Sequence, residues 1–354
     1  MDANKLLADV QQTYRKIKET AQDKLREEDY AVSWIWAGNL SKQESCLFDA
    51  ADALDSVRRI SATHLYNIPR TGEKLLKSID WQAENFRRTL GYDLPAGYAE
   101  SPLHAPDIYV QRDGRPISNE VFRNAYLCEL FRRTHPSPGP QLTALELGAG
   151  MGNLARTLLS ARAVGRYVVI DIQSTLVFSY LFLRLSFPEK RAVFATSVEE
   201  ARAAIADGTD LVFIPSHFDR ALDCFRPDLF VNTASLGEMP NTTIRHWISM
   251  VQERAEPRFL LVSNRYLNPV PPFIVEARKN ENEASVLFDH RWRVRHWWFD
   301  PFYAAVPMRA WAPARSSSSS NACPRMRPNA GRRRGRSAVP PFSWTCSSRS
   351  GCRS

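Results

Sequence analysis

The sequence predicts an α/β protein in which a parallel sheet follows a helical N-terminal region and precedes a disordered tail. Apolar residues recur at helical spacing in the first part of the chain, up to about residue 91, and the last part lacks any periodicity. Between them, strand and helix patterns alternate over about 142–263, which is typical of a parallel sheet covered by helices. We therefore expect three regions, at residues 1–118, 119–312 and 313–354.

Residues 1–118 are predicted to form a helical cap or lid. Apolar residues recur at helical spacing near the start of this region, at Leu6, Leu7, Val10, Tyr14 and Ile17. Two further helices are expected over 44–60 and 73–90, and Gly91 is a typical stop for the second. Residues 94–116 are rich in Pro, Gly and Tyr and predict a crossing loop.

Residues 119–312 are predicted to contain the sheet. A helix is expected over 119–133, and the proline-rich segment 135–140 then breaks the chain. Strands are expected at 142–147, 167–171, 210–215, 228–232 and 258–263, with a further candidate at 192–196 and a late antiparallel strand at 291–299. Helices are expected at 153–161, 174–185 and 242–254.

The tail, residues 313–354, holds the entire net charge of the chain. The sequence has 47 basic and 38 acidic residues and a net charge of +9, and this tail contains nine arginines, no lysine and no acidic residue. The rest of the chain is therefore neutral, and its charge gives no reason to expect nucleic acid as a partner. A Ser/Arg/Pro-rich segment cannot bury enough apolar surface to offset its chain entropy, so we expect disorder and an incomplete C-terminal closure of the sheet.

Composition excludes several classes of protein. The chain is 44% hydrophobic and 24% charged, as in ordinary soluble proteins. No stretch approaches the roughly 20 apolar residues of a membrane span, and the N-terminus has no signal-peptide pattern. We expect a cytoplasmic protein with no membrane partner, and the sequence is compatible with a homo-oligomer. No His/Cys cluster has the spacing of metal ligands, so no metal site is predicted, and the use of a divalent metal stays open.

A glycine-rich turn follows the first predicted strand. Gly148, Gly150 and Gly152 alternate, and Glu146 lies two residues before the first of them. Bare backbone lets a polar ligand approach closely, and the start of the following helix offers free N–H groups. Asn153 occupies the place of the third glycine in the dinucleotide fingerprint G-x-G-x-x-G, which disfavours NAD.

An acidic residue, Asp171, ends the second predicted strand, 23 residues after Gly148. A carboxylate at this place can accept hydrogen bonds from both ribose hydroxyls. The alternative is a strand-end aspartate that caps the next helix. The glycine turn at this distance favours the ribose role, although NAD enzymes share the position, so Asp171 indicates a nucleoside without identifying the cofactor.

The acid and the glycines together, E-x-G-x-G-x-G, resemble class I methyltransferases. That resemblance implies a Rossmann-like sheet and S-adenosylmethionine as the cofactor. It implies cofactor-binding roles for Glu146, Gly148, Ala149, Gly150, Gly152, Asp171 and Asn232.

Two further segments narrow the resemblance to bacterial sugar O-methyltransferases. Residues 178–183 match an apolar helix that carries Tyr and Leu, and residues 232–239 match an Asn-Thr-x-Ser-x-x-Glu-Met segment. The resemblance covers about 143–263 and implies methyl transfer to a hydroxyl of a sugar or sugar-containing small molecule. A hydroxyl acceptor must lose a proton, and the first candidate for the base is Glu238, with His217 second. Glu238 could instead orient a backbone or substrate group, and His217 could pack beside the adenine or lie exposed.

Two other functions remain open at this point. One is an NAD-dependent oxidoreductase, which Asn153 disfavours. The other is a non-catalytic protein that binds nucleic acid through the basic tail, which is disfavoured because Phe342 and Trp344 are the tail's only aromatic residues. Comparing how much S-adenosylhomocysteine and NAD each stabilise the folded protein would separate the methyltransferase from the oxidoreductase.

Overall fold

The structure is a computed structural model of the chain. It describes residues 2–24, 39–63, 72–223, 225–264, 289, 292–299 and 342–348, with backbone only for 296–299 and 342–348. Among these residues, no helix combines the length and the apolar character that a bilayer span requires.

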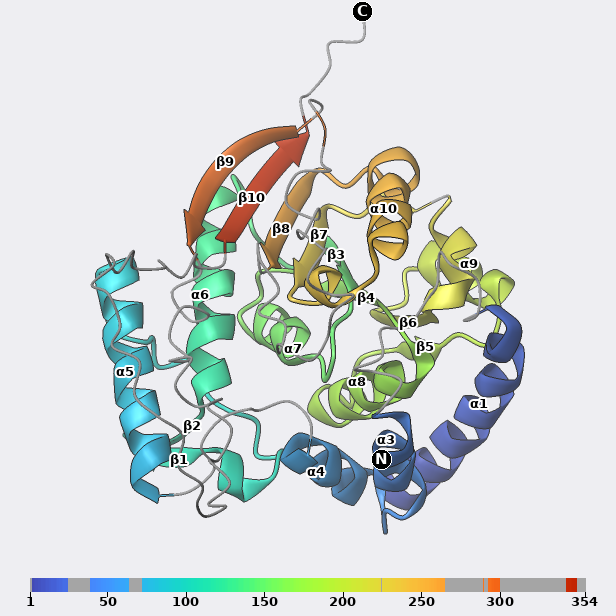
Figure 1. The fold of residues 1–354 in the computed structure, drawn as a ribbon, viewed down its shortest axis with the longest axis horizontal. Helices are drawn as coiled ribbons and strands as arrows, with labels where there is room; N and C mark the ends of the chain where they lie inside the picture. The colour runs from blue at the N-terminus through green and yellow to red at the C-terminus, as the bar shows by residue number, and fades with distance from the viewer. Residues whose placement is uncertain are drawn as a thin grey trace, which may run out of the picture.

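An eight-stranded sheet forms the centre of the molecule, in the order β5-β6-β4-β3-β7-β8-β10-β9 (Figure 1). The strands are β3 (Thr143–Leu147), β4 (Arg166–Asp171), β5 (Ala192–Phe194), β6 (Leu211–Pro215), β7 (Leu229–Thr233), β8 (Phe259–Asn264), β9 (Trp292–Phe299) and β10 (Phe342–Ser348). Six neighbouring strands pair in parallel, in the sheet order β5-β6-β4-β3-β7-β8. Strand β10 is antiparallel to both β8 and β9.

The sheet has the doubly wound topology. Without the edge strand β5 and the antiparallel strand β10, the order across the sheet is β6-β4-β3-β7-β8-β9. When these six strands are numbered 1 to 6 along the chain, that order reads 3-2-1-4-5-6, which is the Rossmann order. Helices cover both faces, so the central strands are apolar along their whole length, as in β6, where all five residues are buried. The predicted Rossmann-like α/β class is confirmed.

Helices from different parts of the chain cover the two faces. One face carries α6 (Asn119–Thr134), α7 (Asn153–Ser160) and α8 (Gln173–Ser186). The other carries α9 (Val198–Ala206), η3 (Ser216–Leu222), α10 (Asn241–Ser249) and the π-helical turn η5 (Met250–Ala255). Side chains of β3 alternate between the two apolar clusters, with Ala144 in one and Leu145 and Leu147 in the other.

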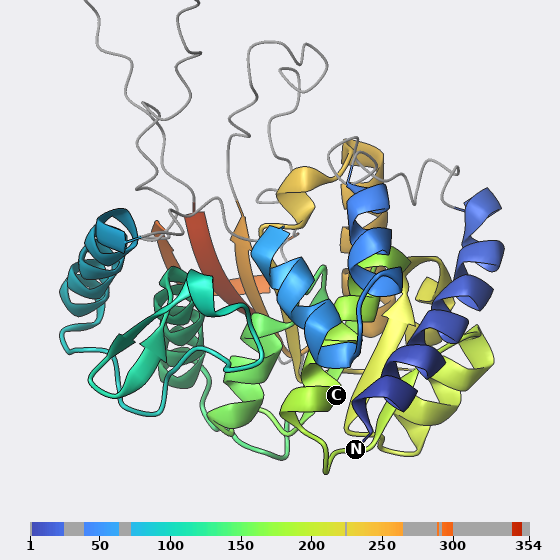
Figure 2. The same cartoon turned by 90° about the horizontal axis from the view of Figure 1, so that it is seen from below.

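The N-terminal helices pack outside the first face (Figure 2). They are α1 (Ala3–Lys24), α3 (Leu40–Phe48), α4 (Ala53–Thr63) and α5 (Gly72–Leu90). α1, α3 and α4 contact α8, and α5 contacts α6, so this region shares an apolar core with the sheet. The single helix predicted over 44–60 is wrong, because Asp52 accepts a hydrogen bond from the Asp55 N–H (2.8 Å) and starts a new helix, α4.

The segment predicted as a crossing loop, 94–116, contains ordered elements. A 3-10 turn, η2 (Pro106–Ile108), is followed by a hairpin of β1 (Val110–Arg112) and β2 (Arg115–Ile117). Asp113 and Gly114 form the tip of the hairpin with φ angles of 52° and 73°. An Asp-Gly pair is a common two-residue hairpin turn, so the sequence carried a signal for this element.

Part of the predicted disordered tail belongs to the sheet. Residues 342–348 form β10, which pairs with β8 and with β9 and closes the sheet at that side. The predictions of disorder and of incomplete closure are therefore wrong for these residues. Alternation of Phe342, Trp344 and Cys346 with smaller polar residues is a strand signal that the Ser/Arg composition concealed. The rest of 313–354 lies outside the described residues.

Candidate functional site

The site lies where the connections after neighbouring strands leave toward opposite faces of the sheet. β3 leads into α7 on one face, and its neighbour β7 leads through η4 (Leu236–Glu238) into α10 on the other. Ligands bind at such a switch point, outside the carboxyl ends of the strands. Most of the residues predicted from the sequence lie along this edge.

The three glycines after β3 adopt backbone conformations that favour glycine. The φ angles are 72° at Gly148, 58° at Gly150 and 84° at Gly152, which is also the N-cap of α7. Ala149 accepts a hydrogen bond from the Gly152 N–H at 2.9 Å and closes the turn. Positive φ at all three positions explains why glycine occupies them.

Gly148 is also fixed by a close neighbour. A Cβ atom at this position would lie 2.2 Å from Ser235 Oγ, far inside contact distance. The Gly148 N–H donates to the Ile170 carbonyl at 2.7 Å, which binds the start of the turn to β4. The glycine turn and the loop after β7 are thus packed directly against each other.

Asp171 ends β4 beside the glycine turn. Its carboxylate accepts from the Gly150 N–H at 3.0 Å and from the Ile172 N–H at 2.8 Å. The pKa of Asp171 is raised to about 7, mainly by burial and in smaller part by the nearby Glu238, against the opposing effect of the two N–H donors. A carboxylate has roughly four acceptor positions, so two remain for ligand hydroxyls when the hydrogen bonds from described residues are counted. The structure thus joins the two motifs that the sequence placed 23 residues apart.

Glu146 lies beneath the turn, inside the protein. It is 1% exposed and accepts a hydrogen bond from the Tyr167 hydroxyl at 2.8 Å. Burial raises the pKa of Glu146 to about 8, whereas the Tyr167 hydroxyl acts in the opposite direction. A direct contact of Glu146 with a cofactor stays a prediction, and in this structure its carboxyl group contacts the Tyr167 hydroxyl of β4.

Asn232 is completely buried at the end of β7. Its Nδ2 donates to the Leu147 carbonyl (2.8 Å) and to Ser235 Oγ (2.6 Å), and its Oδ1 accepts from Asn264 (2.7 Å). Both amide hydrogens are therefore used inside the protein. The predicted role of Asn232 in binding the cofactor stays untested, and its contacts indicate that it holds the walls of the crevice.

The two candidate bases lie apart. Glu238 ends η4, is half-buried and lies close enough to Asp171 to raise its pKa. His217 follows β6 and is 8% exposed, with its Nε2 3.4 Å from Thr20 Oγ1 of α1 and its ring against Phe218. β6 and β7 are three strand positions apart, about 14 Å at the usual spacing. Glu238 therefore lies near the glycine turn, and His217 lies under the N-terminal helices.

Polar side chains that sequence reasoning missed lie between these two places. Gln173, Ser174 and Ser216 are at most 7% exposed, and Gln173 Oε1, Ser174 Oγ and Ser216 Oγ have no hydrogen-bond partner among the described residues. Asp171 pairs in register with Pro215, so Gln173 and Ser216 follow neighbouring strand ends. Buried polar atoms need partners, and these acceptors and hydroxyls suit a nucleoside. These polar residues come directly after the apolar strands β4 and β6, and that position in the sequence could have identified them.

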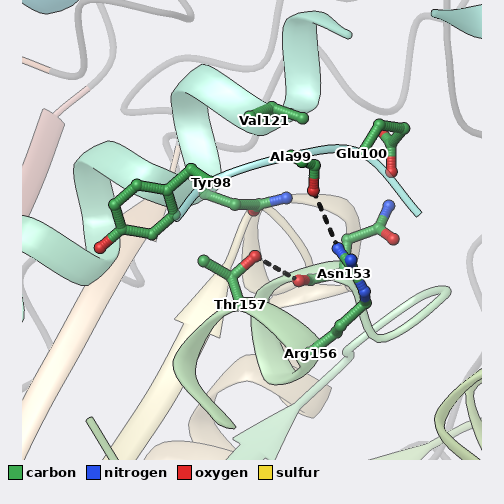
Figure 3. Close-up of a pocket in the computed structure, with 8 residues that line it drawn as sticks. Tyr98, Ala99, Glu100, Val121, Asn153, Arg156 and Thr157 are labelled. Carbon is green, nitrogen blue, oxygen red and sulfur yellow. Dashed lines mark hydrogen bonds between the residues drawn. The ribbon is translucent and has the colours of Figure 1, made fainter. Parts of the chain in front are cut away.

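A small pocket opens beside the first turns of α7 (Figure 3). Asn153, Arg156 and Thr157 line one side of it, and the segment around Glu100 lines the other. Arg156 Nη1 donates to the Ala99 carbonyl at 3.0 Å and so ties that segment to the helix that follows the glycine turn. The flank of the turn is thus fixed from the N-terminal region, a contact that the sequence did not indicate.

Side chains of the kinds that bind metal ions are scattered over the part of the chain that the structure describes. No group of three or more His, Cys, Asp or Glu side chains is placed there so as to hold a metal ion.

Comparison with known proteins gives matches at the level of structure. No protein-family model matches the sequence, and no curated protein matches it. Among solved structures, the chain is similar to a protein from Pyrococcus horikoshii that carries a provisional assignment as an RNA methyltransferase (TM-score 0.35, 12% identity, 66% of this chain and 85% of that chain). It is similar to the small RNA methyltransferase HEN1 (TM-score 0.37, 14% identity, 64% of this chain), of which it spans only a quarter (25%).

A third similar structure is a SAM-dependent methyltransferase from Geobacter sulfurreducens in complex with S-adenosyl-L-homocysteine (TM-score 0.33, 16% identity, 50% of this chain and 68% of that chain). All three TM-scores are below 0.5. The fold class therefore rests on the sheet order of this chain.

Proposed function

We propose that the protein is an S-adenosylmethionine-dependent methyltransferase that transfers a methyl group to a hydroxyl of a sugar or sugar-containing small molecule. The observation that carries the proposal is the contact between the two sequence motifs. The Gly150 N–H, in a turn of three glycines with positive φ, donates to the carboxylate of Asp171 at 3.0 Å at the topological switch point. A bare backbone turn beside a carboxylate suits a nucleoside that carries a polar tail.

The residues of the site suggest how the cofactor would be held. The spare acceptor positions of Asp171 would take the ribose hydroxyls, and the turn from Gly148 to Gly152 would receive the amino-acid part. Gln173 and Ser216, whose buried polar atoms lack partners among the described residues, would face the purine end. When bound, S-adenosylmethionine supplies a sulfonium methyl group for in-line transfer.

The protein must place the acceptor and take its proton. Glu238 is the candidate base, since it ends η4 beside the glycine turn and is close to Asp171. A carboxylate there can accept the proton of a hydroxyl within hydrogen-bond reach. His217 lies about three strands away, beneath α1, and we assign it to the nucleoside side of the crevice. Sugar as the acceptor, and oxygen as the methylated atom, rest on the sequence resemblance of residues 178–183 and 232–239.

Calorimetry with three ligands tests the cofactor. We expect S-adenosylhomocysteine and S-adenosylmethionine to bind with dissociation constants in the micromolar range, about −8 kcal/mol, and NAD to give no heat. Binding of NAD without binding of S-adenosylhomocysteine would instead support the oxidoreductase.

Transfer of labelled methyl groups tests the acceptor. The protein, labelled S-adenosylmethionine and a panel of nucleotide sugars and glycosides are incubated, and methylated products are identified by mass spectrometry. A product methylated on a sugar oxygen supports the proposal. Label found only in RNA or protein would contradict the substrate class and leave the cofactor assignment intact.

A further inference from the structure

A buried amide pair connects the ends of β7 and β8 at the rim of the crevice. Asn264 Nδ2 donates to Asn232 Oδ1 at 2.7 Å, and the two residues are 6% and 0% exposed. Two side-chain amides in contact inside a protein are strongly oriented, because each donor and acceptor that loses its partner remains unsatisfied. The pair therefore has one arrangement that satisfies its neighbours.

One side of the pair faces the glycine turn. Asn232 Nδ2 donates to the Leu147 carbonyl (2.8 Å), the last residue before Gly148, and to Ser235 Oγ (2.6 Å). Ser235 Oγ in turn donates to the same Leu147 carbonyl at 3.0 Å, and it is the atom that a Cβ on Gly148 would meet. These contacts set the distance between the end of β3 and the loop after β7.

The other side of the pair holds η4. Asn264 Oδ1 accepts from the Gly237 N–H at 3.2 Å, and Asn232 Oδ1 accepts from the Leu236 N–H at 3.4 Å. The residues just before η4 are also constrained, since Ala234 has φ 70° and its N–H donates to the Ser263 carbonyl at 2.7 Å. A non-glycine residue in this conformation is strained and persists only where the surroundings impose it.

We propose that Asn264 is a positioning residue of the site, which acts through Asn232 and the backbone of Gly237 to set the place of η4, and hence of Glu238, relative to the glycine turn. Asn264 touches neither the turn nor Glu238 in the contacts described, so its effect is indirect. The relevance of this role to methyl transfer rests on the proposed function. The amide pair itself is independent of it.

Hydrogen exchange measured by mass spectrometry tests the proposal on the full chain. In Asn264→Ala, the amides of Leu236 and Gly237 should exchange at least about tenfold faster than in the wild type, after normalisation to the amides of β4. The matched control is Gln252→Ala, which removes another buried side-chain amide, in η5. Gln252 Oε1 accepts from the Asp289 N–H (2.9 Å) and from Trp292 Nε1 (3.2 Å), and neither contact involves η4. Equal exchange at Leu236 and Gly237 in the two variants would overturn the proposal.

A second variant covers the case in which Asn264→Ala does not fold. Asn264→Asp keeps the size of the side chain and the acceptor for the Gly237 N–H, but it places an oxygen against Asn232 Oδ1 in place of a donor. Faster exchange at Leu236 with Gly237 still protected is the expected result. Unchanged exchange at Leu236 would contradict the role of the pair.

Adding S-adenosylhomocysteine links the pair to the site. In the wild type the ligand should slow exchange both at Gly150 and at Gly237, whereas in Asn264→Ala it should protect Gly150 alone. Protection of Gly237 to the same degree in both proteins would overturn the positioning role. If the ligand protects neither residue in the wild type, the proposed function fails, and the ligand-free comparison still decides whether the amide pair holds η4.

Discussion

Asp171 and Asn232 lie at the ends of strands flanking the same strand, β3, yet their surroundings are opposite in kind. Asp171 is half-buried and receives two backbone N–H groups on a carboxylate that has further acceptor positions. Asn232 is completely buried, and protein atoms use both of its amide hydrogens. Both lie at the ends of apolar strands and look equivalent in the sequence.

The difference separates residues that can receive a ligand from residues that shape the place where it binds. A polar side chain with unused acceptors and a pKa near neutrality responds to a ligand, whereas a saturated amide resists displacement. Position at the edge of the sheet is therefore insufficient to assign a binding role. Spare hydrogen-bonding capacity decides between the two.

The largest expected effect comes from Gly148→Ala, which disrupts the contact between the glycine turn and the loop after β7. The added methyl group would lie 2.2 Å from Ser235 Oγ and would occupy a residue with φ 72°. The turn must therefore shift, and we expect affinity for S-adenosylhomocysteine, measured by calorimetry, to fall at least about 100-fold, or roughly 2.7 kcal/mol. Gly97→Ala is the control, because its Cβ would meet no atom within 4 Å. Equal affinity in both variants would remove the turn from the site.

The second-largest effect concerns Asp171 and is measured as the pH dependence of ligand affinity. The pKa of Asp171 is raised to about 7 by burial, and ribose hydroxyls favour the ionised form, so binding releases a proton. Affinity for S-adenosylhomocysteine should therefore rise about tenfold between pH 6 and pH 8. Asp171→Asn should bind about tenfold more weakly than the wild type at pH 8 and show little change with pH. A variant that retains the slope would place the titrating group elsewhere.

A smaller effect is expected from Glu146→Gln, measured as stability. The folded-state pKa of Glu146, about 8, lies above its unfolded value near 4.3. The acid therefore stabilises the fold at low pH, and this contribution is lost progressively as pH rises from about 4.3 to about 8. The amide keeps an acceptor for the Tyr167 hydroxyl, so urea unfolding of Glu146→Gln should show about 1 kcal/mol less loss of stability between pH 7 and pH 8 than the wild type. A decline as steep as in the wild type would mean that Glu146 is not responsible for it.

The smallest effect concerns the strained residue beside Asn232. Ala234 has φ 70°, and glycine adopts this conformation without the steric cost. Ala234→Gly should change the free energy of unfolding by less than about 1 kcal/mol, with the relief of strain offset by a more flexible unfolded chain. Thermal unfolding measures this free energy. A loss of stability well above about 1 kcal/mol would show that packing of the Ala234 methyl group contributes to the fold.

Local patterns in the sequence predicted the fold class and the ligand side of the site. The glycine turn and Asp171 were found because each depends on a few consecutive residues after an apolar strand. The parallel strands were found for the same reason, since strands buried on both faces are apolar runs.

The remaining features depend on contacts between distant residues. Asn264 meets Asn232 across 32 positions, and Arg156 reaches Ala99 across 57, and neither pair shares a local pattern. The spare capacity of Asp171 and the saturation of Asn232 likewise depend on neighbours that become visible only in the folded chain. Composition misled at residues 342–348, where serine and arginine nearby hid a strand.

The position of β10 has a consequence for the order of assembly. β9 hydrogen-bonds to β10 and to no other strand that the structure describes, and β10 comes at residues 342–348. As the chain is synthesised, β8 keeps an unpaired edge, and β9 has no partner strand among those described, until residues 342–348 leave the ribosome. An unpaired strand edge invites wrong pairing. The nascent protein is therefore exposed to wrong strand pairing during the interval between synthesis of β8 and synthesis of β10.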